Sequence, residues 1–254
     1  MRGAIGDEYP VFPFAAQGFA VLCHTLFPLD WARAAREADG GLPQQFGPAD
    51  ADMRLIQDGV DAAIDELDRR GIIDTRRIAI TGLSAGGQSV EYALIHMPRL
   101  TAAISSGSHL TTATHYMAYP TGREEFRRAG FESSASPRYD TRSISRNASR
   151  IRAPLLMNLS EEDFETESVV SLRAAGRAVE MFVYPDENHI KNQPAHRLAI
   201  YNRNIDWMNF WLRGVESGLS GDTSQYARWR ALREEHCRQT AEDPPWFCRQ
   251  ARAS

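Results

Sequence analysis

The segment Arg77-Ile78-Ala79-Ile80-Thr81-Gly82-Leu83-Ser84-Ala85-Gly86-Gly87 indicates the class of fold. An apolar run over 77–81 predicts a buried strand, and the apolar pattern over 85–97 predicts a helix that Pro98 ends. Between them lies G-x-S-x-G, the motif of a sharp strand-to-helix turn that presents a serine. Its glycines let the backbone fold back closely on itself. We therefore expect Ser84 at the carboxyl end of a strand, at the positive end of a helix.

Predicted strands and helices alternate along the rest of the chain. Further strands are predicted at 18–23, 101–105, 155–159 and 179–184, and helices at 49–70, 165–175 and 194–212. This alternation indicates an α/β protein, with a mostly parallel sheet and helices on both faces.

Two segments depart from the alternation. Residues 106–152 are rich in Ser, Thr and Arg, which suits a cap or substrate loop inserted after the strand at 101–105. Residues 220–254 form a charged tail that is partly helical around 226–235. We therefore expect a catalytic domain over 1–219, including the insertion, and a C-terminal tail over 220–254.

Composition narrows the classes of function. The chain has 254 residues, 43% of them hydrophobic, which suffices for one large domain. Its formal charge is −4, with 29 basic and 33 acidic residues, so no nucleic-acid footprint is expected. It contains no apolar run of about 18 residues, which predicts no membrane span. Residues 1–10 do not resemble a secretory signal, so a cytoplasmic location is expected.

The chain has three cysteines, Cys23, Cys237 and Cys248, and no CxxC pair. This sparse, odd count is not typical of a disulfide framework or a metal site. Cys237 and Cys248 are close enough in the tail to form a bridge, but we expect two free thiols there.

Candidates for a base and an acid follow two other strands. Serine is a weak nucleophile that needs a base, and the base needs an orienting acid. In the α/β-hydrolase fold these residues occur in the order Ser, acid, His, each on a loop after a strand. Asp163 follows the strand at 155–159, and His189 follows the strand at 179–184. We therefore expect both side chains at the same sheet edge as Ser84.

Other residues compete for these roles. Glu161 and Glu162 are the alternatives to Asp163 as the acid. The other histidines considered are expected at packed or solvated positions, His96 and His196 on helices and His109 and His115 on the surface of the insertion. Contact with substrate is the alternative for His109 and His115.

The developing oxyanion needs two hydrogen-bond donors. The backbone N–H of Ala85, next to the nucleophile, is the expected first donor, and the sequence does not identify the second. This chemistry uses only groups of the protein and water, so no cofactor and no metal are expected.

Several motifs resemble the catalytic domain of the prolyl oligopeptidase family of serine peptidases. They are GLSAGG at 82–87, RAPLL at 152–156, Asp163 and PDENH at 185–189. Other segments resemble the lasso peptide isopeptidases within that family: RGAIGDEYP at 2–10, GFAVL at 18–22, NRNIDWMNFWLRG at 202–214 and QYARWRALR at 225–233.

The resemblance implies roles and a substrate. Ser84 is the implied nucleophile, Asp163 the acid and His189 the base of a hydrolase that acts through an acyl-enzyme. The implied substrate is a peptide, including the isopeptide ring of a lasso peptide, in which the N-terminal amine joins an Asp or Glu side chain. A carboxylesterase with the same triad, and an inactive fragment or binding module, are the alternatives.

The resemblance also implies missing parts. Family members carry a β-propeller ahead of the hydrolase domain, and residues 9–17 resemble the first helix of that domain. The strands before this helix are then absent, including one between the segments 19–23 and 77–81. The same absent segment supplies the second oxyanion donor in the family, a tyrosine. We therefore expect the chain to be a fragment or to begin at an internal methionine, with an upstream propeller in a full-length protein.

Overall fold

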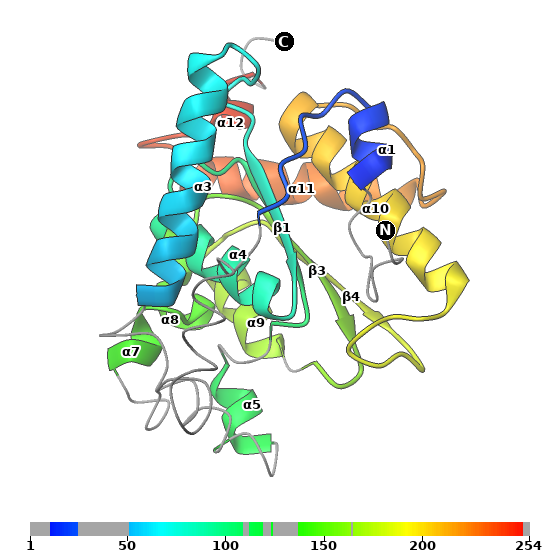
Figure 1. The fold of residues 1–254 in the computed structure, drawn as a ribbon. Coiled ribbons are helices and arrows are strands. Elements are labelled where there is room, and N and C mark those ends of the chain that lie inside the picture. The colour runs from blue at the N-terminus through cyan, green and yellow to red at the C-terminus, as the bar shows by residue number, and fades with distance from the viewer. Residues whose placement is uncertain are drawn as a thin grey trace, which may run out of the picture.

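A parallel four-stranded sheet forms the centre of the computed structural model (Figure 1). The structure describes residues 11–24, 51–108, 112–118, 123, 137–163 and 165–250. The strands are β1 (Ala79–Leu83), β2 (Ala102–Ser106), β3 (Leu155–Ser160) and β4 (Val179–Tyr184). They pair in the order β1-β2-β3-β4, and every pair is parallel. The predicted parallel sheet is thus confirmed, including the strands predicted at 77–81, 101–105, 155–159 and 179–184.

The helices surround this sheet. They are α1 (Val11–Ala16), α3 (Ala51–Arg69), α4 (Ala85–His96), α5 (Ala113–Ala118), α7 (Pro137–Asp140), α8 (Ile144–Asn147), the 3-10 helix η1 (Ala148–Arg150), α9 (Thr166–Ala174), α10 (Pro194–Arg213), α11 (Ser224–Gln239) and α12 (Trp246–Gln250). The helices predicted at 49–70, 85–97, 165–175 and 194–212, and around 226–235, are confirmed. Within the described part of the chain, no helix has the length and apolar character that crossing a membrane requires.

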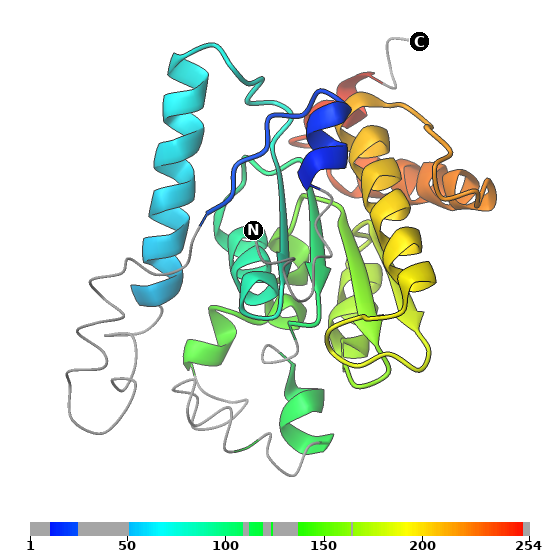
Figure 2. The ribbon, with the colours of Figure 1, turned by 45° about the vertical axis from the view of Figure 1, so that its right-hand side comes forward.

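Each face of the sheet packs on its own set of helices, because successive strand residues point to opposite faces. One buried cluster joins Leu155 and Met157 of β3 to residues of α4, α8 and α9. The other joins Leu156, which lies between them in β3, to α10 and α11. Figures 1 and 2 show α4 and α9 on one side of the sheet and α10 on the other.

The predicted strand at 18–23 is wrong. Residues 19–24 have no regular secondary structure, and the side chains of Val21 and Leu22 are 39% and 53% exposed. A strand forms only where a neighbour pairs with its backbone. Among the described residues β1 pairs with β2 alone, so none of them offers this segment a partner. Phe19 packs instead on Phe14 of α1 and beneath the guanidinium of Arg213 of α10.

The C-terminal tail is packed onto the helix α10. Trp229 of α11 is fully buried, and its ring lies edge-on to that of Trp207 of α10, with 5.1 Å between ring centroids. Phe247 of α12 packs similarly on Trp211, at 5.0 Å. These aromatic contacts bury large apolar side chains and so fix both tail helices on α10.

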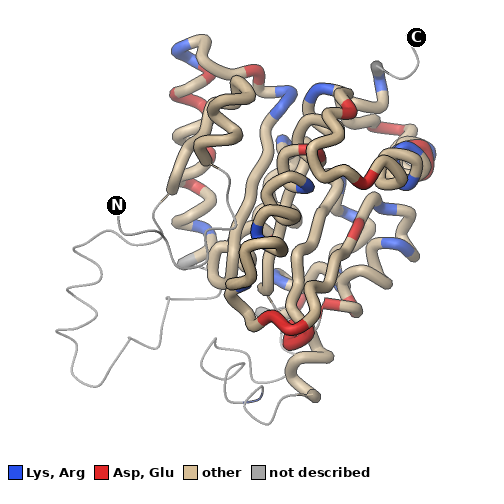
Figure 3. The backbone as a smooth tube through the Cα atoms, turned by 90° about the vertical axis from the view of Figure 1, so that its right-hand side faces the viewer, with Lys and Arg blue, Asp and Glu red and all other residues tan. Residues whose placement is uncertain are grey.

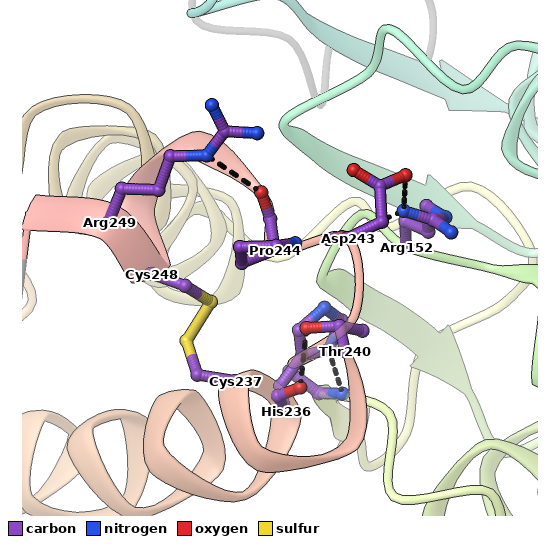
Figure 4. Close-up of a disulfide and its surroundings, with 9 residues drawn as sticks. Arg152, His236, Cys237, Thr240, Asp243, Pro244, Cys248 and Arg249 are labelled. Atoms are coloured by element: carbon purple, nitrogen blue, oxygen red, sulfur yellow. Dashed lines mark hydrogen bonds and ion pairs between the residues drawn. A yellow bond between two sulfur atoms is a disulfide. The ribbon is translucent and has the colours of Figure 1, made fainter.

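A disulfide joins Cys237 of α11 to Cys248 of α12, so the expectation of two free thiols is wrong (Figure 4). The docking of Phe247 turns α12 back toward α11 and brings the two cysteine Cα atoms to 5.5 Å, a normal bridging distance. Next to it, Arg152 forms an ion pair with Asp243 (Figure 4). Cys23 is a free, exposed cysteine.

The carboxyl edge of the sheet is where the candidate residues lie. The arrows of β3 and β4 point toward the end of the molecule that carries α5 and α7, two helices of the insertion (Figure 1). Acidic residues gather in the loops at this edge (Figure 3), where Glu161, Glu162 and Asp163 follow β3 directly.

Candidate active site

Ser84 occupies a strained turn between β1 and α4. Its φ is 57° and its ψ is −120°, a conformation that costs a non-glycine residue free energy. The N–H of Ser84 donates to the carbonyl of Ser106, at 2.9 Å, which ties the turn to the end of β2. A Cβ at Gly82 would lie 2.1 Å from the carbonyl oxygen of Gly86. The close approach of the two sides of the turn therefore requires glycine at position 82.

Asp163 and His189 come together at the same edge. The Asp163 side chain is 1% exposed, and its Oδ1 lies 3.4 Å from Nδ1 of His189. Its Oδ2 accepts hydrogen bonds from the N–H and the hydroxyl of Ser160, at 2.7 and 3.0 Å. Catalytic hydrogen bonds are often this long in unliganded enzymes. The His189 side chain is 29% exposed, so its ring is open to a ligand.

Gly107 lies between the serine turn and the His–Asp pair, a role that sequence reasoning missed. It has a φ of +60°, and a Cβ there would lie 2.8 Å from Cε1 and Nδ1 of His189 and 2.9 Å from Oδ1 of Asp163. Its neighbour Ser106 accepts the hydrogen bond from Ser84. The turn after β2 thus contacts all three candidate residues. Proximity to His189 arises only in the fold, so no sequence pattern could identify it.

Lys191 is a second residue that sequence reasoning missed. Its side chain is fully buried, with Nζ 3.8 Å from Oδ2 of Asp163. Nζ also donates to the carbonyls of Asn158 and His189, each at 3.2 Å. A buried ammonium needs such partners, and here it places a positive charge beside the buried carboxylate and fixes the backbone of His189. The sequence signal was weak, a lysine two positions after the candidate base.

Glu187 shapes the loop that carries His189. Its carboxylate accepts the N–H groups of Asn192 and Gln193, at 2.7 and 3.0 Å, and lies 2.9 Å from Nδ1 of His196. Burial by itself would raise the pKa of Glu187, but these hydrogen bonds outweigh it and hold the pKa below its ordinary value. The loop is therefore closed by an ionised carboxylate.

The alternative residues lie elsewhere. Glu161 and Glu162 are exposed, and Glu161 accepts the N–H of Asp186 at 3.3 Å. His96 contacts the carbonyl of Thr141 at 2.8 Å, and His196 contacts Glu187, so both are packed as expected. The surface position expected for His115 is wrong: it is 2% exposed, because α5 turns it inward. His109 lies outside the described residues.

Ala85, the expected oxyanion donor, is the first residue of α4 and is exposed. N–H groups in the first turn of a helix have no partner within the helix, so this one is suited to bind an anion. Among the residues that the structure describes, no group of three or more His, Cys, Asp or Glu is arranged to hold a metal ion.

A cavity of about 440 Å³ lies at the opposite, amino edge of the sheet. Three of the arginines that line it are bound to aspartates: Arg76 to Asp74 at 2.9 Å, Arg99 to Asp65 at 2.9 Å, and Arg152 to Asp243. Ser84, Asp163 and His189 do not line this cavity.

The fold is that of an α/β-hydrolase. Residues 53–214 match the prolyl oligopeptidase family, and the chain belongs to that family.

The chain is also similar to individual members of the family. It is 36% identical over 242 residues to the lasso peptide isopeptidase AtxE2 of Asticcacaulis excentricus, and the aligned residues cover 92% of this chain and 34% of that protein. The chain thus spans about a third of the length of this curated relative. A solved structure of an AtxE2 variant with Astexin3-dC4 bound has a TM-score of 0.76 and 34% identity, over 92% of this chain and 37% of that chain. The acylaminoacyl peptidase of Pyrococcus horikoshii, at 23% identity and a TM-score of 0.58 over 68% of this chain and 30% of its own, shares the fold.

Proposed function

We propose that the chain is the catalytic part of a serine peptidase that hydrolyses peptide or isopeptide bonds through an acyl-enzyme. The observation that carries this proposal is the buried Asp163–His189 pair at the same sheet edge as Ser84 in its strained turn. Because Nδ1 of His189 faces Asp163, Nε2 is the nitrogen available to the serine hydroxyl.

The proposed reaction has two halves. Ser84 Oγ attacks the amide carbonyl while His189 takes its proton, and the N–H of Ala85 donates to the developing oxyanion. His189 then gives the proton to the leaving amine, which departs and leaves an ester on Ser84. A water molecule, deprotonated by His189, attacks this ester and releases the acid. Asp163 stabilises the imidazolium in both halves, and no cofactor enters the reaction.

The isopeptide of a lasso peptide is the proposed substrate. The support is the likeness to AtxE2, a lasso peptide isopeptidase, a variant of which has been solved with Astexin3-dC4 bound. The chain spans about a third of that relative, so an upstream propeller remains part of the proposal. The division into a catalytic domain at 1–219 and a tail at 220–254 stays a prediction.

Incubation with a lasso peptide tests this substrate, because hydrolysis of the ring adds the mass of one water and linearises the peptide. Amide and ester substrates with the same acyl group separate a peptidase from a carboxylesterase. Turnover of the ester with no turnover of the amide or the lasso peptide would contradict the proposal. Ser84→Ala is the control that assigns any turnover to this site.

The cytoplasmic location also stays a prediction. The Cys237–Cys248 disulfide bears on it, because such bonds persist in oxidising compartments and are rare in the cytoplasm. Alkylation of the protein in intact cells, followed by mass spectrometry of the tail peptide, decides whether these thiols are free where the protein resides.

A further inference from the structure

Two glutamates are fully buried next to the proposed triad. Glu91 lies on α4, the helix that begins after Ser84, and Glu165 immediately precedes α9 in the loop of Asp163. The hydroxyl of Ser108 contacts both carboxyl groups, that of Glu91 closely and Oε1 of Glu165 at 3.2 Å. Helix α4 and two loops, those after β2 and β3, bring these residues together at the carboxyl edge of the sheet.

The number of protons in this cluster is constrained. A serine hydroxyl has one proton, so Ser108 donates to one of its two carboxyl contacts and must accept from the other. The accepting contact requires a proton on Glu91 or Glu165. Two ionised carboxylates at full burial would also repel one another in a medium that solvates neither.

The cluster directly adjoins the site. Ser105 also donates to Glu91, at 3.3 Å, so Glu91 binds serines on both sides of Gly107. That glycine is the residue packed against the His189 ring and Asp163. Ser168 of α9 holds the other oxygen of Glu165, at 2.9 Å. A movement of this cluster would therefore move the turn behind the base.

We infer that Glu91, Ser108 and Glu165 form a positioning network in which the two carboxyl groups share one proton, and that this network holds the 105–108 turn against His189. The inference rests on the proposed function, in which His189 is the base. The residues touch neither substrate nor the reacting atoms, so they act through the turn.

The electrostatics agree with this geometry. Burial raises the pKa of Glu165 well above its ordinary value, and the neighbouring charge of Glu91 raises it further, with a smaller contribution from Asp163. The hydroxyls of Ser168 and Ser108 oppose the shift. These are the groups that face Glu165 from α4, from its own loop, from α9 and from the turn after β2.

The raised pKa of Glu165 determines how the stability of the folded protein changes with pH. The folded state binds this proton more tightly than the unfolded state, so the stabilisation is complete below the unfolded pKa of about 4.5. It is lost as pH rises toward the folded pKa. Glutamine cannot ionise, yet its amide donates to Ser108 as the protonated acid does. Glu165→Gln should therefore remove this pH dependence and keep the network.

The test compares the full chain with Glu165→Gln, Glu165→Ala and Glu234→Gln, the last making the same change at an exposed position of α11. Labelling rate with a fluorophosphonate and thermal midpoint are measured from pH 5 to pH 10. We expect Glu165→Gln to label at the parent rate near pH 6 and to lose the alkaline decline of the parent. Glu165→Ala should label about tenfold or more slowly throughout, because the turn loses its support.

The two readouts separate the inference from the proposed function. If the parent is not labelled at any pH, the proposed function fails, and the thermal midpoints still test the shared proton. The inference requires the midpoint of Glu165→Gln to rise relative to the parent and to Glu234→Gln as pH increases above 5. Parallel midpoints for all three proteins, or equal labelling of Glu165→Ala and the parent, would overturn it.

Discussion

Replacing Gly107 with alanine should displace the proposed base. The added Cβ would lie 2.8 Å from two atoms of the His189 ring and 2.9 Å from Oδ1 of Asp163. Asp163 cannot move freely, because its side chain is 1% exposed and accepts hydrogen bonds from Ser160. The His189 side chain is 29% exposed, so its ring is the group that shifts, away from Asp163.

The loss of stability expected for Gly107→Ala has two parts. A φ of +60° costs alanine about 1–2 kcal/mol relative to glycine. Overpacking against a fixed neighbour costs about 1–3 kcal/mol more. Gly107→Ala should thus lower the free energy of unfolding by about 2–5 kcal/mol. A shift of about 1 Å in a catalytic group can cost about 100-fold in rate, which is the loss expected here.

Gly71→Ala is the matched control, since Gly71 has a φ of +66° with nothing within 4 Å of an added Cβ. The free energy of unfolding of Gly71→Ala should fall only by the cost of the backbone conformation, about 1–2 kcal/mol, and its labelling rate should equal that of the parent. Urea unfolding measures the stabilities, and the rate of fluorophosphonate labelling measures the site. Equal labelling rates for Gly107→Ala and Gly71→Ala would show that Gly107 does not position His189.

Three further predictions concern buried charges and the tail. Lys191→Met removes the cation beside Asp163 and the donor to two carbonyls, so it should lower the free energy of unfolding by about 3–5 kcal/mol; an unchanged urea midpoint would contradict this. Cys248→Ser should cost about 3 kcal/mol of stability, a difference that reductant abolishes, whereas Cys23→Ser should cost nothing. Burial alone would raise the pKa of Asp206, but hydrogen bonds from Ser217, Ser220, Leu219 and Gln225 hold it below the unfolded value of 3.8. The contribution of Asp206 to stability is present above pH 3.8 and is lost as pH falls. Asp206→Asn should therefore be less stable at pH 7 by about 2 kcal/mol, and its thermal midpoint should fall less than that of the parent as the pH is lowered.

Local patterns were sufficient to predict the sheet. Each strand and helix has its own apolar period, so β1 to β4 and the main helices could be located without knowledge of their neighbours. The loops that carry Asp163 and His189 followed from the same strands, since parallel strands end at one edge.

Features that depend on distant contacts could not be predicted. The apolar segment at 18–23 has the composition of a strand, but none of the described residues pairs with it. The Cys237–Cys248 bridge depends on how α12 docks on α10. The packing of Gly107 on His189 and the meeting of Glu91 with Glu165 likewise join segments that only the fold brings together.

Fluorophosphonate labelling of the purified chain beside Ser84→Ala, with the labelled peptide identified by mass spectrometry, tests directly whether Ser84 is the nucleophile. We expect one adduct, on Ser84, in the parent protein and none in the variant. Labelling of both proteins to the same extent, or no labelling of a parent that circular dichroism shows to be folded, would contradict the claim that Ser84, Asp163 and His189 form a working triad in this chain.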